Sequence, residues 1–280
     1  MSGESFSDAA LVLLGHGSSV DEDAGATVRQ HAAELRRRGV FAEVREAFWK
    51  QEPQVKEALA GLKHGRVFLV PIFISEGHFS DDVIPSELGF SATAAGDLRI
   101  QDRAKQKFFY CKPIGTHEKM ADVLLGRARE VIEQFPFPRA PGPGEITLFI
   151  AGHGTKQNPS SRKAIELQAG RLRSLGIYAE VQAVFIEEEP QIGDCYTLSE
   201  TKNIVVVPFL VSDGPHARQD IPIMLGESES TVQKRLKAGR PGWRNPTEKK
   251  GKMVWYSAVA GSSPAVVEVI LERVREPAKG

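Results

Sequence analysis

LVLLGHGSS, Leu11 to Ser19, returns almost unchanged as LFIAGHGTK, Leu148 to Lys156. In each copy a histidine stands between two glycines, directly after an apolar run. A short apolar run predicts a buried strand, and the glycines predict a tight turn at its end. The repeated stretch therefore indicates two copies of one strand-and-turn unit, each of which presents a histidine.

The repetition continues through both halves of the chain at a constant shift of 137 residues. Gly39–Val44, GVFAEV, matches Gly176–Val181, GIYAEV, in the same register as the two histidine turns. Further on, Gly115 pairs with Gly261 at a larger shift, so the second half contains an insertion after its third strand. A period this long indicates duplicated domains and not a solenoid of short repeats.

The segment between the halves, Phe135–Glu145, is rich in proline and glycine. This composition disfavours a helix or a central strand and predicts a linker. We therefore expect an N-terminal repeat over residues 1–134, a linker over 135–145 and a C-terminal repeat over 146–280.

Within each half, apolar strands alternate with helical patterns. In the first half the sequence predicts strands near 11–14, 40–48, 66–74 and 107–114, and helices near 24–38, 53–62 and 117–134. Alternation of this kind, with continuously apolar strands, is typical of a parallel sheet covered on both faces. The predicted fold class is α/β, with two duplicated doubly wound domains that each contain a four-stranded parallel sheet flanked by helices.

The composition excludes several classes of protein. The 280 residues are 41% hydrophobic, and 36 Lys and Arg balance 36 Asp and Glu, so no global field favours nucleic acid or an anionic membrane. No apolar run is long enough to span a bilayer, and the N-terminus lacks a signal-peptide pattern, so we expect a cytoplasmic protein. Cys111 and Cys195 are too few for a disulfide framework or a thiolate cage.

Three residues of the second half that can bind a metal lie where consecutive predicted strands end. His153 follows the first strand, Glu187 the second and His216 the third. Because the carboxyl ends of parallel strands meet at one edge of a sheet, these side chains are expected to converge. Two imidazoles and a carboxylate suit Co²⁺, Fe²⁺, Ni²⁺ or Zn²⁺ and leave coordination positions open. The sequence therefore predicts a metal-handling site at this edge.

The first half offers a second, weaker candidate. His16 and His78 occupy comparable positions, but Lys50 stands where the second half has Glu187. A lysine supplies positive charge where a metal needs an anion. We therefore expect the site of the N-terminal repeat to be degenerate.

The motifs together resemble a known family. GHGS or GHGT after a first strand, Phe-x-Glu ending a second, and VVPF followed by G-x-H and DIP after a third resemble the class II tetrapyrrole chelatases. The pattern is similar to the sirohydrochlorin cobaltochelatase and ferrochelatase family, called CbiX or SirB, in its two-repeat form. The resemblance implies a lyase that inserts Co²⁺ or Fe²⁺ into sirohydrochlorin, in cobalamin or siroheme biosynthesis. It also implies that His153, Glu187 and His216 bind the metal and catalyse insertion.

The resemblance further implies that the divalent metal is a substrate and that no organic cofactor is used. The expected partner is the tetrapyrrole, with no nucleic acid and no membrane. A chain with two fused repeats is expected to act as a monomer, and further oligomerisation stays open. The alternative function is a non-catalytic carrier of metal or tetrapyrrole with the same fold. A hydrolase with a nucleophilic histidine is disfavoured, because Gly15 and Gly152 stand where such enzymes need an arginine.

A tetrapyrrole with several carboxylates requires a local basic patch on a neutral protein. Residues 226–252 contain eight Lys or Arg against three Glu, a net charge of +5. The eight are Lys234, Arg235, Lys237, Arg240, Arg244, Lys249, Lys250 and Lys252. The first four are predicted to bind the substrate carboxylates. A solvated loop is an equally open interpretation of the segment.

Overall fold

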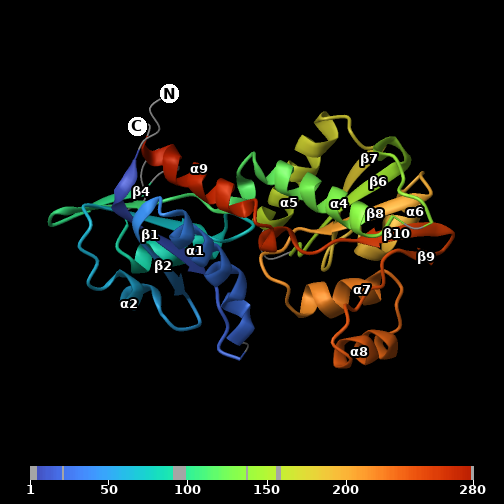
Figure 1. Cartoon of the computed structure of the whole chain (residues 1–280), viewed down its shortest axis with the longest axis horizontal. Coiled ribbons are helices and arrows are strands. Elements are labelled where there is room, and N and C mark those ends of the chain that lie inside the picture. The colour runs from blue at the N-terminus through green and yellow to red at the C-terminus, as the bar shows by residue number, and fades with distance from the viewer. Residues whose placement is uncertain (1–4, 21, 91–98, 137, 156–158, 279–280) are drawn as a thin grey trace. The chain divides into compact units, whose positions relative to one another are not determined.

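The computed structural model describes residues 5–20, 22–90, 99–136, 138–155 and 159–278, apart from the side chains of residues 22, 78, 79 and 278. The chain forms two compact units, one made of residues 1–117 together with 264–280, and the other of residues 118–263. Each unit contains a five-stranded sheet with helices packed against it (Figure 1).

The first unit contains the strands β1 (Phe6–Gly15), β2 (Phe41–Phe48), β3 (Arg66–Pro71), β4 (Arg99–Arg103) and β5 (Gln106–Tyr110). Their order in the sheet is β2-β1-β3-β5-β4. Its helices are α1 (Ala26–Arg38), α2 (Val55–Leu59), α3 (Ile84–Glu87) and α9 (Val266–Ala278), with short turns η1 (Glu22–Gly25), η2 (His78–Val83) and η3 (Ile114–Thr116).

The second unit contains β6 (Ile146–Gly152), β7 (Glu180–Phe185), β8 (Asn203–Pro208), β9 (Thr247–Lys249) and β10 (Lys252–Tyr256), in the order β7-β6-β8-β10-β9. Its helices are α4 (Met120–Gln134), α5 (Pro159–Ser174), α6 (Cys195–Leu198), α7 (Ile221–Met224) and α8 (Glu229–Lys237). Short helical turns are η4 (Pro143–Glu145), η5 (Ile192–Asp194), η6 (His216–Asp220) and η7 (Ala260–Ser262). The two sheets thus repeat one topology.

The predicted α/β class and the duplication of a doubly wound sheet are confirmed, but the predicted number of strands is wrong. Each sheet has a fifth strand, β4 or β9, which pairs antiparallel with the last parallel strand. These strands read RIQDR and TEK, with Ile100 as their one apolar residue, and so lack the apolar runs by which the other strands were predicted. At the edge of a sheet a short polar strand is favourable, because it discourages pairing with other chains.

The two glycines of each GHG turn are required for different structural reasons. A Cβ on Gly152 would overlap the end of the Ile165 side chain of α5, so a larger residue would push this side chain away from the end of β6. Gly154 has φ +61° and Gly17 has φ +66°, in the left-handed region that glycine adopts without strain. The turn therefore holds the intervening histidine at the end of the strand on a closely packed backbone.

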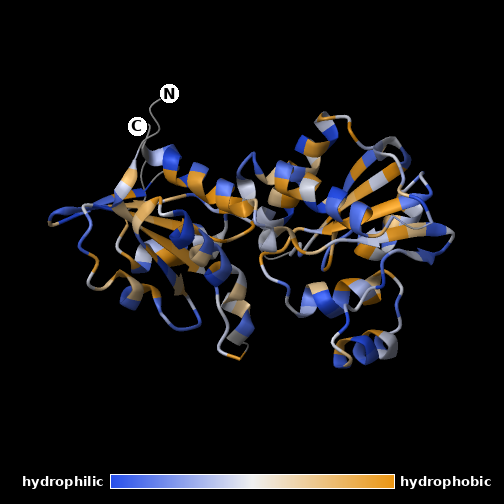
Figure 2. Ribbon diagram, in the orientation of Figure 1, coloured by the Kyte–Doolittle hydropathy of each residue, from blue (hydrophilic) through white to orange (hydrophobic). Residues whose placement is uncertain are grey.

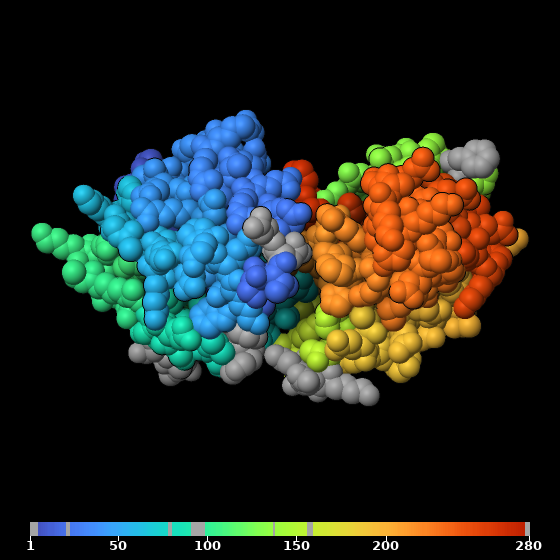
Figure 3. Space-filling model, turned by 90° about the horizontal axis from the view of Figure 1, so that it is seen from below, coloured from blue at the N-terminus to red at the C-terminus, as the bar shows by residue number. Residues whose placement is uncertain are grey.

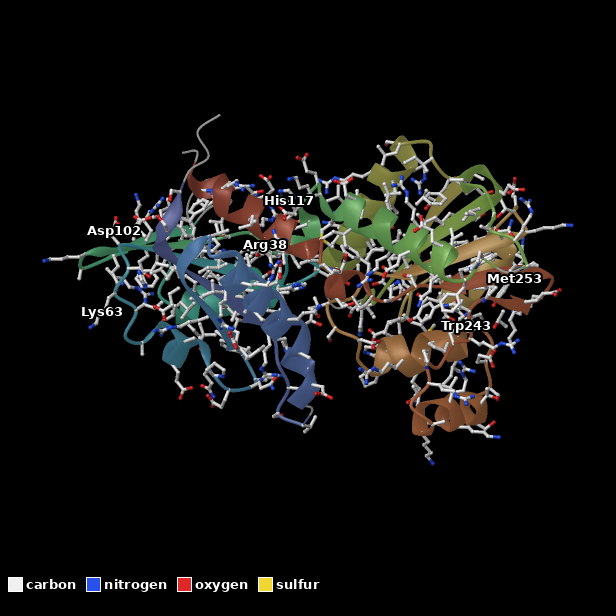
Figure 4. All side chains as sticks on the ribbon, viewed as in Figure 1. Arg38, Lys63, Asp102, His117, Trp243 and Met253 are labelled. Atoms are coloured by element: carbon white, nitrogen blue, oxygen red, sulfur yellow. The ribbon has the colours of Figure 1, made fainter. Side chains whose placement is uncertain are left out.

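Apolar side chains fill both faces of each sheet, as expected for parallel strands between helices. β6, β8 and β10 are largely hydrophobic along their length (Figure 2). Phe149 and Val206 are fully buried on the face covered by α6, α7 and Trp243. Figure 4 shows Trp243 between the sheet and α7. Among the described residues, no helix has both the length and the apolar character that crossing a membrane requires.

The compact units differ from the sequence repeats by one helix each. α4 belongs to the first repeat by sequence but packs against β8 and β10 of the second unit, and α9 packs against β3 and α1 of the first. A nearly buried arginine fixes each helix. Arg127 Nε donates to the Val259 carbonyl at 3.1 Å, and Arg273 Nε donates to the Pro113 carbonyl at 2.8 Å. The last helix of each repeat thus completes the compact unit that contains the other repeat's sheet.

Candidate functional site

The three predicted residues of the second repeat lie at the carboxyl edge of its sheet. His153 directly follows β6, Glu187 lies two residues beyond β7, and His216 begins η6 after β8. β6 lies between β7 and β8, so the strand order reverses its direction along the sheet at this point. The carboxyl ends at such a switch point are where ligands bind in open α/β sheets. The topology therefore brings together residues that are far apart in the sequence.

The geometry of the trio suits one shared ion. His153 Nε2 lies 3.7 Å from Glu187 Oε1. The rings of His153 and His216 are edge to face with centroids 5.0 Å apart. Two donors bound to one tetrahedral ion at about 2.1 Å lie roughly 3.4 Å from each other. The His153–Glu187 distance is close to this value, whereas a ligand shared with His216 requires its ring to move.

The hydrogen bonds of both imidazoles fix which ring nitrogen is available. His153 Nδ1 lies 2.9 Å from the carbonyl of Gly154, and His216 Nδ1 lies 2.7 Å from Oδ2 of Asp220. A carbonyl or carboxylate oxygen only accepts, so each Nδ1 carries the hydrogen and donates it. In the neutral rings Nε2 then keeps its lone pair, which is the form that binds a metal.

The loop that carries Glu187 is held by an arginine of α5. The Arg162 guanidinium stacks on the ring of Phe185 at 4.4 Å and donates to Glu188 Oε2 at 2.9 Å and to the Glu189 carbonyl at 2.8 Å. These contacts hold residues on both sides of Glu187, whose own side chain is 51% exposed. Glu187 is thus a carboxylate on a rigid loop with its oxygens open to a ligand.

The turn that carries His216 is also held by a hydrogen bond from the neighbouring strand β10. Tyr256, at the end of β10, donates its hydroxyl to the carbonyl of Ala217 at 2.7 Å. Burial raises the pKa of Tyr256, so the hydroxyl keeps its proton and remains a donor. In the first repeat Tyr110 donates in the same way to the Ser80 carbonyl, also at 2.7 Å. The anchor therefore belongs to the shared framework of both repeats.

The charges near the trio favour a cation. Within the described part of the chain, Glu187 and Asp220 lie against histidines and form no ion pair with a lysine or arginine. With neutral imidazoles these two carboxylates give the cluster a charge that offsets a divalent ion. No three His, Cys, Asp or Glu side chains of the described residues already enclose a metal position. The arrangement is an open one, in which a ligand must draw the side chains together.

The first repeat has the same backbone but different chemistry. Lys50 N donates to the His16 carbonyl at 2.8 Å, as Glu187 N donates to the His153 carbonyl at 3.0 Å. Lys50 therefore occupies the structural position of Glu187, as the spacing in the sequence predicts. His16 Nδ1 also bonds the following glycine carbonyl at 2.9 Å. His78 begins η2, and its side chain lies outside the described residues.

The predicted basic residues are divided between two ends of the sheet. α8 carries Lys234, Arg235 and Lys237 and packs against η6, next to His216. In contrast, Lys252 donates to the Ser199 and Thr201 carbonyls at 2.7 Å each, at the amino end of the sheet. Of the four residues predicted to bind carboxylates, Arg235 already donates to the Pro241 carbonyl at 2.7 Å, whereas Lys234, Lys237 and Arg240 are exposed.

Sequence analysis did not single out Asp220, Arg162 and Tyr256, which contact His216 or hold the loops of the site. The available signal for Asp220 was its spacing of four residues from His216, which places two side chains on one face of a helical turn. Nothing in the sequence distinguishes Arg162 from other helix-surface arginines, because its partners follow a different strand. The same applies to Tyr256, which reads as an ordinary strand residue.

Replacing Gly261 with alanine is expected to disturb the His216 loop. A Cβ at Gly261 would overlap the carbonyl of Val211, in the segment between β8 and η6, and Gly261 N bonds the Leu210 carbonyl at 2.9 Å. Overpacking of this kind costs about 1–3 kcal/mol. We expect a lower melting temperature and weaker Co²⁺ binding. Gly170→Ala on α5 is the matched control, because a Cβ there meets nothing within 4 Å. Equal behaviour of the two variants would contradict the prediction.

The fold and the site define a class of duplicated, doubly wound α/β proteins with a His-Glu-His cluster at the carboxyl edge of one sheet. The CbiX family model matches residues 10–131 and again residues 147–277, which together span most of the chain. The chain belongs to the CbiX family.

Relatives agree with this assignment. The chain is 37% identical over 278 residues to a probable sirohydrochlorin cobaltochelatase of Halobacterium salinarum, covering 95% of this chain and 91% of the relative. It is 24% identical over 279 residues to a sirohydrochlorin ferrochelatase of Bacillus subtilis, covering 96% and 92%. A multi-domain Deinococcus radiodurans protein with structural similarity to chelatases has a TM-score of 0.75 at 27% identity, covering 95% of this chain. The chain spans 54% of that protein's length.

Proposed function

We propose that this protein inserts a divalent metal, Co²⁺ or Fe²⁺, into sirohydrochlorin, and that His153, Glu187 and His216 of the second repeat carry the reaction. The observation that supports this proposal most is the pair of imidazoles whose Nδ1 atoms are both engaged, beside a carboxylate 3.7 Å from one Nε2. Such a cluster binds a metal through nitrogen and oxygen only. It lacks the thiolates that would retain the ion too firmly for transfer.

Insertion requires the exchange of one metal ion for two pyrrole protons. The two Nε2 lone pairs and the Glu187 carboxylate hold the incoming ion. As the ion passes to the pyrrole nitrogens, the two imidazoles are released, and each Nε2 can accept one of the two departing protons. Glu187, half exposed, then passes protons to water. The groups that hold the metal thus become the proton acceptors of the same reaction, and charge is conserved throughout.

The names of the relatives divide between cobalt and iron, and the donor set accepts both, as it accepts Ni²⁺. We propose Co²⁺ or Fe²⁺ as the metal substrate, for cobalamin or siroheme biosynthesis, without an organic cofactor. Because one chain carries both repeats, we propose that the protein works as a monomer. We propose the cytoplasm as its location.

The deciding experiment is anaerobic spectrophotometry of sirohydrochlorin with Co²⁺, Fe²⁺ or Ni²⁺ in separate reactions. We expect multiple turnovers with cobalt or iron, seen as the shift from metal-free to metallated absorption. A carrier would bind one equivalent and stop. Absence of multiple turnover with every metal, in protein that is folded by circular dichroism, would overturn the enzymatic proposal in favour of the carrier.

The exposed cations of the insertion are proposed to bind the carboxylates of the substrate. Lys234 and Lys237 lie on α8, which packs against the turn of His216, and Arg240 follows this helix. Figure 3 shows the orange part of the chain, which includes α8, on the surface of its unit. The predicted Arg235 contributes mainly by fixing the insertion, since it bonds the Pro241 carbonyl. We infer a carboxylate-binding surface beside the metal-handling cluster.

Changing Lys234, Lys237 and Arg240 together to alanine is expected to raise KM for sirohydrochlorin by roughly tenfold, because each lost charge-assisted hydrogen bond contributes about 1 kcal/mol or less at an exposed site. The turnover number at saturating substrate should change little. The control removes the same charge outside the insertion, at Lys163 of α5, Lys202 before β8 and the exposed Lys105 between β4 and β5. A similar rise in KM for both triple variants would indicate a general charge effect and contradict the assignment.

A further inference from the structure

The turn η6 places an acid directly beside one of the candidate metal ligands. His216 Nδ1 lies 2.7 Å from Oδ2 of Asp220, and both belong to this one short turn. η6 is a π-type turn, in which the Ile221 N–H bonds the His216 carbonyl, so Asp220 nearly completes one turn from His216. Turns of this type are often found at functional sites. The contact is therefore set by the backbone of the turn as well as by the side chains.

The backbone of η6 is fixed from several directions. The Tyr256 hydroxyl bonds the Ala217 carbonyl at 2.7 Å, and Arg218 N bonds the Gly214 carbonyl at 3.0 Å. Gly242 of the insertion packs so closely on the Arg218 carbonyl that a Cβ there would overlap it. With the main chain held in place, the remaining freedom of His216 is rotation of its side chain. The bond to Asp220 restrains this rotation.

We propose that Asp220 is a positioning residue for metal binding, acting through His216; this inference rests on the proposed function. Its carboxylate holds the hydrogen on Nδ1, so that Nε2 presents its lone pair, and it turns the ring edge to face with His153, 5.0 Å away. A carboxylate partner also makes the imidazole a stronger donor to a metal. Asp220 therefore sets the affinity for the ion without touching it and without contacting the tetrapyrrole.

The test measures metal binding separately from insertion. Co²⁺ is titrated into wild type, Asp220→Ala and Asp220→Asn in the absence of tetrapyrrole, with calorimetry and the visible absorption of the bound ion as readouts. We expect the Kd for Co²⁺ to rise about 10–100-fold in Asp220→Ala, as for other partners of metal-bound histidines. In the insertion assay KM for Co²⁺ should rise accordingly, while KM for sirohydrochlorin stays within about twofold of wild type.

Asp213→Asn is the matched control. Asp213 lies on the same loop, forms an ion pair with Arg218 at 3.0 Å, and carries the same charge near His216. Its loss should leave the Kd for Co²⁺ within about threefold, since an exposed charge contributes little. An equal loss in Asp213→Asn and Asp220→Ala would show a general charge effect and overturn the inference.

A double-mutant cycle separates positioning from a structural role. If Asp220 acts through His216, Asp220→Ala should cause no further loss of Co²⁺ affinity in the background of His216→Ala. Additive losses would overturn the proposal, as would an unchanged Kd in both Asp220 variants or a wild type that binds no Co²⁺. The near-isosteric Asp220→Asn keeps the test valid if the alanine variant does not fold. A third outcome is also possible: wild type binds Co²⁺ but does not insert it, and the Asp220 variants bind Co²⁺ more weakly than wild type. This result would refute the proposed function and leave the role of Asp220 in metal binding standing.

Discussion

His153→Ala is expected to lower the rate of metal insertion by about 10²–10⁴-fold, the range that a lost proton acceptor usually costs. The substitution removes the Nε2 lone pair that lies 3.7 Å from Glu187, and with it both a metal donor and a proton acceptor. Affinity for Co²⁺ should fall as well, because only one imidazole and one carboxylate remain. Anaerobic spectrophotometry of sirohydrochlorin with Co²⁺ gives the rate, and titration without tetrapyrrole gives the affinity.

The chain supplies its own matched control for this prediction. His16 lies in the same Gly-His-Gly turn, with its Nδ1 bonded to the next carbonyl at the same 2.9 Å as in His153. Its neighbour at the second strand end is Lys50 and not a carboxylate, so His16→Ala should retain activity within a few-fold of wild type. Loss of insertion in His16→Ala with activity retained in His153→Ala would move the active site to the first repeat.

Truncation after Ser263, which removes α9, is expected to unfold the first compact unit. Six apolar side chains of this helix are buried, namely Val266, Val267, Val269, Ile270, Leu271 and Val274. Burying them contributes roughly 9–18 kcal/mol at 1.5–3 kcal/mol each, which is comparable to the whole stability of a typical domain. Arg273, with its hydrogen bonds to Pro113 and Thr116, is lost at the same time.

Hydrogen exchange read peptide by peptide checks this result. Amides of β1 and β3 should lose their protection in the truncated chain, while those of β6 and β8 keep most of theirs. Arg275→Ala is the control, because its side chain is 42% exposed and its ion pair with Glu272 lies on the surface of the same helix. Undiminished protection of β1 and β3 after truncation would show that α9 is not needed by this unit.

The sequence predicted the features that depend on pattern and order. Apolar runs ending in Gly-His-Gly identified β1 and β6, and the rule that ligands bind at the carboxyl ends of parallel strands predicted that His153, Glu187 and His216 would meet. The spacing also predicted Lys50 in the position of Glu187, and both residues form the same backbone hydrogen bond. The catalytic role of the trio remains a prediction until the variants are measured.

Features that depend on tertiary contacts could not be predicted. β4 and β9 are short polar strands whose identity comes from their partners, since they have no apolar face to reveal them. The sequence also could not predict against which sheet α4 and α9 pack. An amphipathic pattern shows that a helix has a buried face but not which sheet covers it. Arg127 and Arg273 look like surface residues in sequence, and only the exchanged packing buries them.

The order of the two units' segments along the sequence has a consequence during synthesis. Residues 118–263 are continuous and can fold as soon as they leave the ribosome, whereas the first unit needs α9, which is translated after the whole of the second. At the usual 5–20 residues per second, the first unit waits roughly 10–30 s for its last helix. During that interval the apolar surface of its sheet that α9 will cover stays open to water and to chaperones. The unit whose sheet is made first is therefore the one that is completed last.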